Sequence, residues 1–307
     1  MDQDDIGIGS FAYAVGEQEC KPADIAGFDA LWQSVSPNTD FAAMGCETYR
    51  RMPGPALPYV ADTVRHTLAD AGVSPAEVSH IVFATSDPTL ARLPHDFAIR
   101  VIDAVGLTGC VPHLLSFQRC CSSQTALRHG RQLFTDPRVR NVLVVALDFT
   151  PDDRDRVRNY ALFSDGAASC LLTRGTPGLV RLVASSIHVD EGGLRGRDSI
   201  LSRKKVADKA LAAVLETSGR RLDQITKVFT ANLYQPLMLF NSAAAGIAPD
   251  RVHYVETLAA YGHCGNTDWM INLADYHQKT GIVAGQTYLA QAPAQGFHAC
   301  SLLEGSA

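Results

Sequence analysis

Two adjacent cysteines, Cys120 and Cys121, stand where an apolar, strand-like run turns into a helical pattern. The run ends near Leu115, and residues from Ser122 onward recur at helical spacing as a buried face. A thiol at such a corner meets unpaired N–H groups and the positive end of the helix dipole, which favour the thiolate. A thiolate there can attack a thioester. The alternative interpretation is that both cysteines are inert packing residues, since free cysteine is among the most buried residue types.

An alternation of strands and helices must position this corner. Apolar runs at 81–84 and 142–147 follow helical stretches at 57–71 and 122–134, as in an α/β fold with a largely parallel, buried sheet. The second half repeats this alternation of strands and helices. Helices are predicted at 206–217, 235–245 and 266–278, and strands at 227–229, 253–255 and 288–291. Each half closes with an antiparallel pair of strands.

A turn at Gly175-Thr176-Pro177-Gly178 separates the two halves. We therefore expect two similar βαβ-type halves, residues 1–174 with the nucleophilic cysteine and residues 175–307 with the catalytic histidine. Because no long linker is visible, the halves are expected to pack across a large interface as one layered α/β structure.

Composition narrows the classes of partner. The chain of 307 residues is 46% hydrophobic, with a net charge of −5 and a pI near 6.0. This charge predicts no basic surface that would bind nucleic acid or an anionic membrane. The N-terminus, Met1 to Asp5, is acidic where a secretory signal would be basic, so we expect a cytoplasmic protein. Eight scattered cysteines without CxxC spacing argue against a zinc site or a disulfide framework, and no cofactor is predicted.

The segment around the cysteines resembles that of ketoacyl-synthase III enzymes of the thiolase superfamily. In that group the reactive cysteine opens a buried helix and is followed six and seven residues later by Ala-Leu. Counting back from Ala126-Leu127 selects Cys120, with Cys121 as the alternative if the alignment slips by one.

Three further stretches carry the resemblance, which spans roughly residues 55 to 303. The segment from Ala69 to Ser86 matches the group's helix, strand and Thr-bearing loop. Phe163-Ser164-Asp165-Gly166-Ala167 resembles the group's Phe-Gly-Asp-Gly-Ala, and Tyr261-Gly262-His263 lies in register with its Tyr-Gly-Asn. The resemblance implies a thiolase-like fold and a homodimer paired through sheet edges of the N-terminal halves. We expect Asp165 to serve structure, in a tight turn between strands.

The chain departs from this pattern at the two side chains that assist the cysteine. Condensing members pair it with a histidine and an asparagine, which support decarboxylation of a malonyl group. Here Ala231 stands at the histidine position and His263 at the asparagine position. Asp268, five residues on, could hold the imidazole in one tautomer. Cys120, His263 and Asp268 then form an activated nucleophile and general base suited to acyl transfer. His263 could otherwise be an ordinary core histidine.

Three other residues stay open as site candidates. Asn232 could supply an amide to the site, take the histidine position after a one-residue gap, or cap the following helix. Asn266 would become the catalytic amide if a three-residue gap were real, and then the role of His263 would fail. His298, in the Gly-Phe segment that contributes N–H groups to the oxyanion site, is a second candidate base or a structural residue.

These features favour an acyltransferase. We expect it to load an acyl group from a coenzyme A or acyl-carrier-protein thioester onto Cys120 and to pass the group to an oxygen or nitrogen nucleophile of a small-molecule acceptor. We expect the reaction to belong to natural-product biosynthesis. The alternatives are a decarboxylating carbon–carbon condensing enzyme with a rearranged dyad, and a non-catalytic partner subunit of a homologous synthase.

Overall fold

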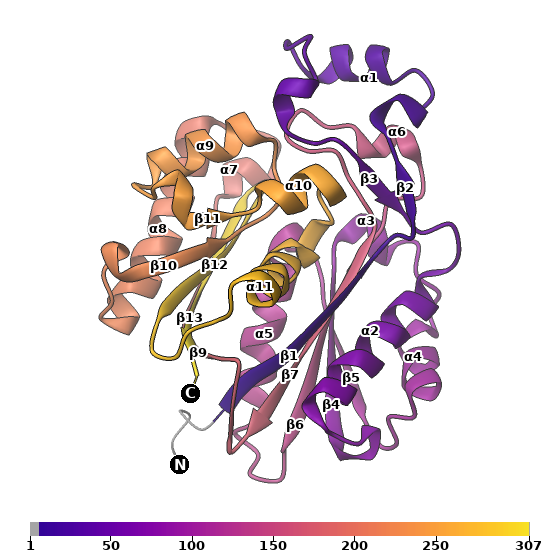
Figure 1. Cartoon of the computed structure of the whole chain (residues 1–307), viewed down its shortest axis with the longest axis vertical. Helices are drawn as coiled ribbons and strands as arrows, with labels where there is room; N and C mark the ends of the chain where they lie inside the picture. Colours follow the sequence, from indigo (N-terminus) through magenta and orange to yellow (C-terminus); the bar gives the residue numbers. More distant parts are fainter. Residues whose placement is uncertain (1–5, 307) are drawn as a thin grey trace.

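The computed structural model describes residues 6–306 (Figure 1). Met1 to Asp5, on which the expectation of a cytoplasmic protein rests, lie outside the described residues. None of the helices in the described range is long and apolar enough to cross a membrane.

The main sheet is built from two sets of strands that follow the same plan. The N-terminal set has the spatial order β5-β4-β6-β7-β1, and the C-terminal set has the order β11-β10-β12-β13-β9. When the five strands of each set are counted in chain order, the second strand pairs in parallel with the third and the fourth. The fifth strand pairs antiparallel with the fourth and the first. The sets meet where Ile8 of β1 lies opposite Val180 of β9.

The strand bounds follow from this plan. The N-terminal strands are β1 (Ile6–Val15), β4 (Val78–Thr85), β5 (Val111–Leu115), β6 (Asn141–Asp148) and β7 (Gly166–Arg174). The C-terminal strands are β9 (Val180–Val189), β10 (Ile225–Phe229), β11 (Val252–His253), β12 (Thr287–Ala294) and β13 (Phe297–Gly305). The short strand β8 (Thr176–Gly178) pairs with β1, and β2 (Gln18–Cys20) pairs with β3 (Tyr49–Arg51) in a separate ribbon.

Helices cover both outer faces and fill the centre. Two helices, α5 (Ser122–Leu133) and α11 (Asp268–Lys279), contact strands of both sets and lie between them (Figure 1). Packed against the N-terminal strands are α2 (Ala56–Ala71) and α4 (Phe97–Val105), while α8 (Ile200–Ser218) packs on β9 and β13. The remaining helices are α1 (Phe28–Val35), α3 (Asp87–Leu90), α6 (Asp153–Arg156), α7 (Glu191–Leu194), α9 (Gln235–Ala244) and α10 (Val255–Tyr261).

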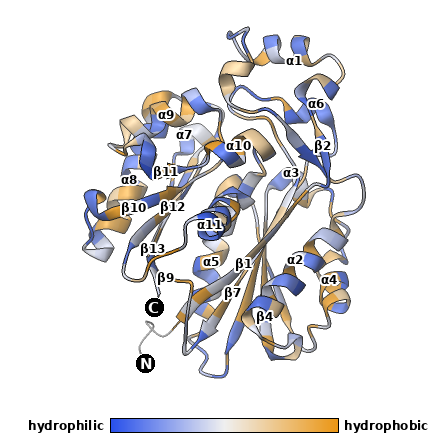
Figure 2. Ribbon diagram, viewed as in Figure 1, coloured by the Kyte–Doolittle hydropathy of each residue, from blue (hydrophilic) through white to orange (hydrophobic). Residues whose placement is uncertain are grey.

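The hydrophobic core explains this layering. Every residue of β6 is buried, as expected for a strand covered on both faces, whereas the outer helices carry both hydrophobic and hydrophilic residues (Figure 2). In α5, Gly130 lets the helix approach the sheet, because a Cβ there would lie 3.2 Å from Val144. The α/β class and layered arrangement expected from the sequence are thus confirmed.

Some predicted bounds were wrong. The helix predicted at 206–217 begins at Ile200, because Ser199 accepts a hydrogen bond from the Ser202 N–H and caps the helix. The strand predicted at 253–255 ends at His253, and α10 begins at Val255. Asp165 lies just before β7 rather than in a tight turn between strands.

The two central helices begin side by side. The Ser123 hydroxyl donates to the Asn266 carbonyl at 2.5 Å and accepts from Trp269 Nε1 at 2.8 Å. Asp148, at the end of β6, accepts from the Asn266 N–H at 2.7 Å and from its side-chain amide at 2.6 Å. Gly265 has a positive φ of 67°, and a Cβ on it would lie 2.2 Å from Asp148 Oδ2. The close approach of the turn before α11 to the end of β6 therefore requires glycine at this position.

We expect Gly265→Ala to lower the free energy of unfolding by about 3 kcal/mol or more, because it combines a left-handed backbone with a clash against Asp148. Gly281→Ala is the matched control, since Gly281 also has a positive φ but no atom lies within 4 Å of the place that an alanine methyl would take. The control should lose only about 1–2 kcal/mol. Denaturant titration followed by circular dichroism measures both, and equal losses would contradict this account.

Candidate active site

The two cysteines at the start of α5 face different surroundings. Cys121 is fully buried, and its thiol donates to the Ala292 carbonyl at 3.0 Å. Burial and the neighbouring Cys120 raise the pKa of Cys121 well above its usual range, which leaves it a neutral packing group. Cys120 is half-buried, and it is the only one of the eight cysteines that is not buried.

The backbone before Cys120 is strained. Phe117 and Arg119 have positive φ values of 65° and 55°, which L-residues other than glycine seldom adopt. Arg119 is anchored by a hydrogen bond of 2.6 Å to Gln295 in the turn between β12 and β13, and the Cys121 N–H donates to the Gln118 carbonyl. The turn thus presents the Cys120 thiol toward the C-terminal half.

His263 faces this thiol from the opposite half. Its Nε2 lies 3.5 Å from Cys120 Sγ, and its Nδ1 lies 2.5 Å from Asp268 Oδ2. The ring is fully buried and packs 4.6 Å from the Phe163 ring, measured between centroids. Its backbone is clamped, because His263 N–H donates to Leu162 and the Ser164 N–H donates to the His263 carbonyl. The structure therefore brings Cys120, His263 and Asp268 together, while their catalytic roles stay a prediction.

Asp268 is the first residue of α11, and backbone donors fix its carboxylate. Oδ2 accepts from the Asn232 N–H at 2.6 Å, and Oδ1 accepts from the Cys264 N–H at 2.8 Å. Burial alone would lower the pKa of His263, but the charges of Asp268 and Cys120 raise it well above its usual range. The arrangement therefore favours a protonated imidazole between two acidic groups.

Asn232 belongs to a buried network behind this chain of residues. Its amide donates to the Gly262 carbonyl at 3.0 Å, and its Oδ1 accepts from Asn272 at 3.0 Å and from Thr257 at 3.3 Å. It does not cap α9, whose N-cap is Tyr234, so that interpretation was wrong. Asn232 instead holds Gly262, which has φ 64° and ψ −149°, a conformation essentially restricted to glycine.

Within residues 6–306 neither of the other two weaker candidates has a hydrogen bond with the thiol. Asn266 binds Asp148 through its side-chain amide and its backbone N–H. His298 lies on β13 next to Ala299, which packs with Cys121, and two residues before Cys300, which packs with Ala210 of α8. Because side chains alternate along a strand, His298 faces α8 and not Cys120.

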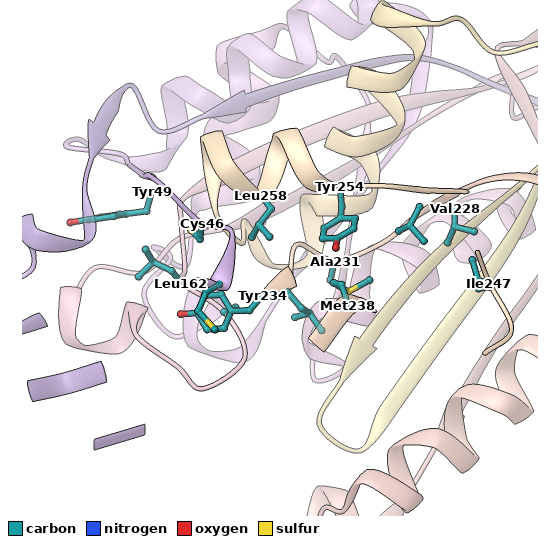
Figure 3. Packing of buried hydrophobic residues seen from close by; sticks show 14 of the residues in the cluster. Cys46, Tyr49, Leu162, Val228, Ala231, Tyr234, Met238, Ile247, Tyr254 and Leu258 are labelled. Carbon is teal, nitrogen blue, oxygen red and sulfur yellow. The ribbon is translucent and has the colours of Figure 1, made fainter. Parts of the chain in front are cut away.

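Ala231, at the position where the resembled enzymes carry histidine, lies in the hydrophobic core. It packs in one cluster with Tyr254 and Met238, and Figure 3 shows it below the Tyr254 ring. Ala231 is 2% exposed. This position contributes packing and no polar group.

Sequence reasoning missed the polar support around the site. Thr257 and Asn272 come from α10 and α11 and complete the Asn232 network, and no spacing rule connects them. Asp165 accepts two hydrogen bonds from the buried Arg156 guanidinium, at 2.8 and 3.0 Å, and others from the Met52 and Thr150 N–H groups. In the described residues no cluster of three or more His, Cys, Asp or Glu side chains is arranged to hold a metal ion.

Comparisons with known proteins place this geometry in context. No family model matches the chain. Beta-ketoacyl-[acyl-carrier-protein] synthase III of Rhodospirillum rubrum is 28% identical over 272 residues, covering 76% of this chain and 79% of the relative.

Several solved structures share the fold over nearly the whole chain. ChlB3, described as an acyltransferase, has a TM-score of 0.84 at 17% identity and covers 98% of both chains. A variant of OleA from Xanthomonas campestris has a TM-score of 0.82 at 14% identity, and 3-oxoacyl-(acyl carrier protein) synthase III from Xanthomonas oryzae one of 0.83 at 16%, each covering 98% of both chains.

The exposure of the thiols predicts selective alkylation. Iodoacetamide should modify the native protein once, at Cys120, because the other seven thiols are buried. Peptide mapping by mass spectrometry identifies the site, and Cys120→Ala should abolish the adduct. Cys110→Ser is the matched control, since Cys110 is 9% exposed and its removal should leave the adduct unchanged. Labelling of Cys110 as fast as Cys120 would contradict the prediction that only Cys120 is accessible to the reagent.

His298 predicts a pH dependence of stability. Burial lowers its pKa to about 4, so as pH falls from about 6.5 to about 4 the unfolded chain takes up a proton that the folded protein excludes. The free energy of unfolding should fall over that range, and His298→Gln should make the decrease smaller. Urea titrations at about pH 7 and pH 4.5 test this, with the exposed His66→Gln as control. An unchanged decrease in His298→Gln would contradict it.

Proposed function

We propose that this chain, which is similar to ketoacyl-synthase III enzymes and shares their fold, is an acyltransferase with Cys120 as its nucleophile. The observation that carries this proposal is the line from Cys120 Sγ through His263 to Asp268. A thiol, an imidazole and a carboxylate in this order form the nucleophile, base and orienting group of acyl-transfer chemistry.

The first half-reaction loads the enzyme. Cys120 Sγ attacks the carbonyl carbon of the donor thioester, and a new carbon–sulfur bond forms as the bond to the donor thiol breaks. The proton that His263 Nε2 holds goes to the leaving thiolate, so a neutral thiol is released. Backbone N–H groups at Cys120 and around Phe297 would stabilise the oxyanion.

The second half-reaction transfers the acyl group. His263 Nε2, now neutral, takes the proton of an acceptor hydroxyl or amine while the acceptor atom attacks the acyl carbon. The bond to Cys120 breaks, and its sulfur leaves as a thiolate beside the protonated imidazole. Asp268 keeps the ring in one tautomer and balances its charge throughout.

The surroundings of Ala231 and Asn266 argue against decarboxylative condensation. The resemblance implies a histidine and an asparagine beside the cysteine in condensing enzymes. Here Ala231 is part of the apolar core, and the amide of Asn266 is bound to Asp148. Within residues 6–306 His263 is the one side chain that forms a hydrogen bond with the sulfur, so an enolate would lack the paired support that condensation uses.

Charged groups near the thiol favour an anionic donor. Burial and the charge of Cys120 raise the pKa of Tyr160 to about 12, while Arg158, Arg119 and Arg203 oppose the rise. The Tyr160 hydroxyl is therefore close enough to Cys120 and to these three guanidinium groups to respond to their charges. The guanidinium groups would attract the phosphate groups of a coenzyme A or acyl-carrier-protein thioester.

The proposal includes a homodimer. Strand β5 is the outer edge of the sheet and leaves its backbone groups on one side unpaired within residues 6–306. The exposed apolar side chains Val111, Leu114 and Phe117 follow the same edge. Pairing of two β5 edges would cover both features.

Incubation with a panel of acyl-coenzyme A and acyl-carrier-protein thioesters tests the function. We expect a stable acyl adduct by intact mass, lost in Cys120→Ala and retained in Cys110→Ser. His263→Ala and Asp268→Asn should lower the transfer rate by about 10²–10⁴-fold, because each removes the proton relay or its orientation.

Other outcomes would overturn the proposal in distinct ways. Carbon dioxide release from a malonyl thioester would identify a condensing enzyme. No adduct across the panel, together with stable association with a second protein, would identify a non-catalytic partner subunit.

A further inference from the structure

A cavity of about 580 Å³ lies among three segments of the N-terminal half. Its walls come from the loop between β3 and α2 (51–57), the loop between α3 and α4 with the start of α4 (92–100), and the segment after β6 (149–156). Cys120, His263 and Asp268 are not among its lining residues. Its volume is within the range of small-molecule sites, which is about 300–1,000 Å³.

The charge of this cavity is opposite to that of the chain. Its lining includes four arginines, Arg51, Arg92, Arg100 and Arg156, against one acid, Asp165. The whole chain carries −5. Because Arg156 and Asp165 neutralise each other in a buried bidentate pair, the remaining three guanidinium groups set the charge.

These three arginines differ in whether their side chains are already bound. Arg51 forms an ion pair with Asp153 and a hydrogen bond with Tyr49. Arg92 and Arg100 are exposed, and within residues 6–306 neither has a side-chain hydrogen bond or an ion pair. Their donors are therefore available to an anionic group, and a guanidinium binds a carboxylate or phosphate through two parallel hydrogen bonds.

The interior of the cavity is apolar. Met52 and Phe97 are buried, and Leu57, Leu93 and Phe149 are half-buried along its wall. A purely inorganic anion would leave this surface in contact with water. A ligand with an anionic head and an apolar body would satisfy both parts of the wall.

A neighbouring cavity carries a smaller excess of positive charge. It is smaller, about 420 Å³, and shares Arg51, Arg92 and Pro151 with the first. Its lining adds Arg154 together with Asp152 and Asp153, so three arginines face two acids. The first cavity has the larger excess of arginine over acid and the broader apolar wall.

We propose that the 580 Å³ cavity is a second ligand site, separate from Cys120, that binds an amphipathic organic anion with a carboxylate or phosphate head. Arg92 and Arg100 bind the head, and Leu57, Leu93 and Phe97 contact the body. The proposal does not depend on the acyl-transfer assignment, because no residue of the Cys120 site takes part.

Calorimetric titration of the full chain with octanoate, octyl phosphate and 1-octanol tests the site. The two anions should bind at least about tenfold more tightly than the neutral alcohol, because only they use the guanidinium donors. The tighter of the two anions identifies the head group. Equal binding of the alcohol and both anions would overturn the proposal.

Variants separate this site from the nucleophile. Arg92→Ala/Arg100→Ala should weaken anion binding by at least about tenfold and leave octanol binding unchanged. Arg128→Ala, which removes an exposed arginine of α5, should leave anion binding unchanged. Cys120→Ala should also bind like the parent protein. Full binding by the double variant, or loss in Cys120→Ala, would sink the idea.

Discussion

The carboxylate of Asp268 is the constraint on which the rest of the site depends. It receives the Asn232 N–H from the end of β10, the Cys264 N–H from the turn before α11, and the ring of His263. Three segments are therefore fixed to one group that is 1% exposed. Since hydrogen bonds to a buried carboxylate are strong and costly to leave unmade, movement of any segment would leave a buried charge without its partners. The position and orientation of the His263 ring are thus set by the segments that are bound to Asp268.

The junction at Asp148 does for the N-terminal half what Asp268 does for the C-terminal half. Asp148 accepts from the Ser86 N–H and hydroxyl on one oxygen and from Asn266 on the other. It therefore joins the end of β4 to the start of α11, across the gap that separates the sulfur from the imidazole. A 3.5 Å contact between residues so far apart in the chain can be kept only if both halves are held in this way.

The sequence predicts more of the fold than of the support around the site. The strand–helix rhythm is local, so α2, α5 and α9 fall close to their predicted bounds. The position of His263 followed from a resemblance in register, and its approach to Cys120 depends on the packing of two halves that no local pattern encodes. The direction of the Asn232 side chain was missed for the same reason, since Thr257 and Asn272 come from other helices. Likewise, the arginine-lined cavity joins three separate segments whose spacing in the chain predicts no contact.

The repeated strand order has an electrostatic consequence. In each half the central helix follows the third strand of the set and precedes the fourth, so α5 and α11 occupy equivalent places. Cys120 precedes the first turn of one, and Asp268 opens the other. The positive ends of the two helices thus lie close together. They can stabilise negative charge on Cys120 and Asp268, on either side of the protonated His263 ring. The two halves therefore share a backbone plan but differ in what they carry at this place: one carries the proposed nucleophile, and the other carries the carboxylate that opposes its positive neighbour.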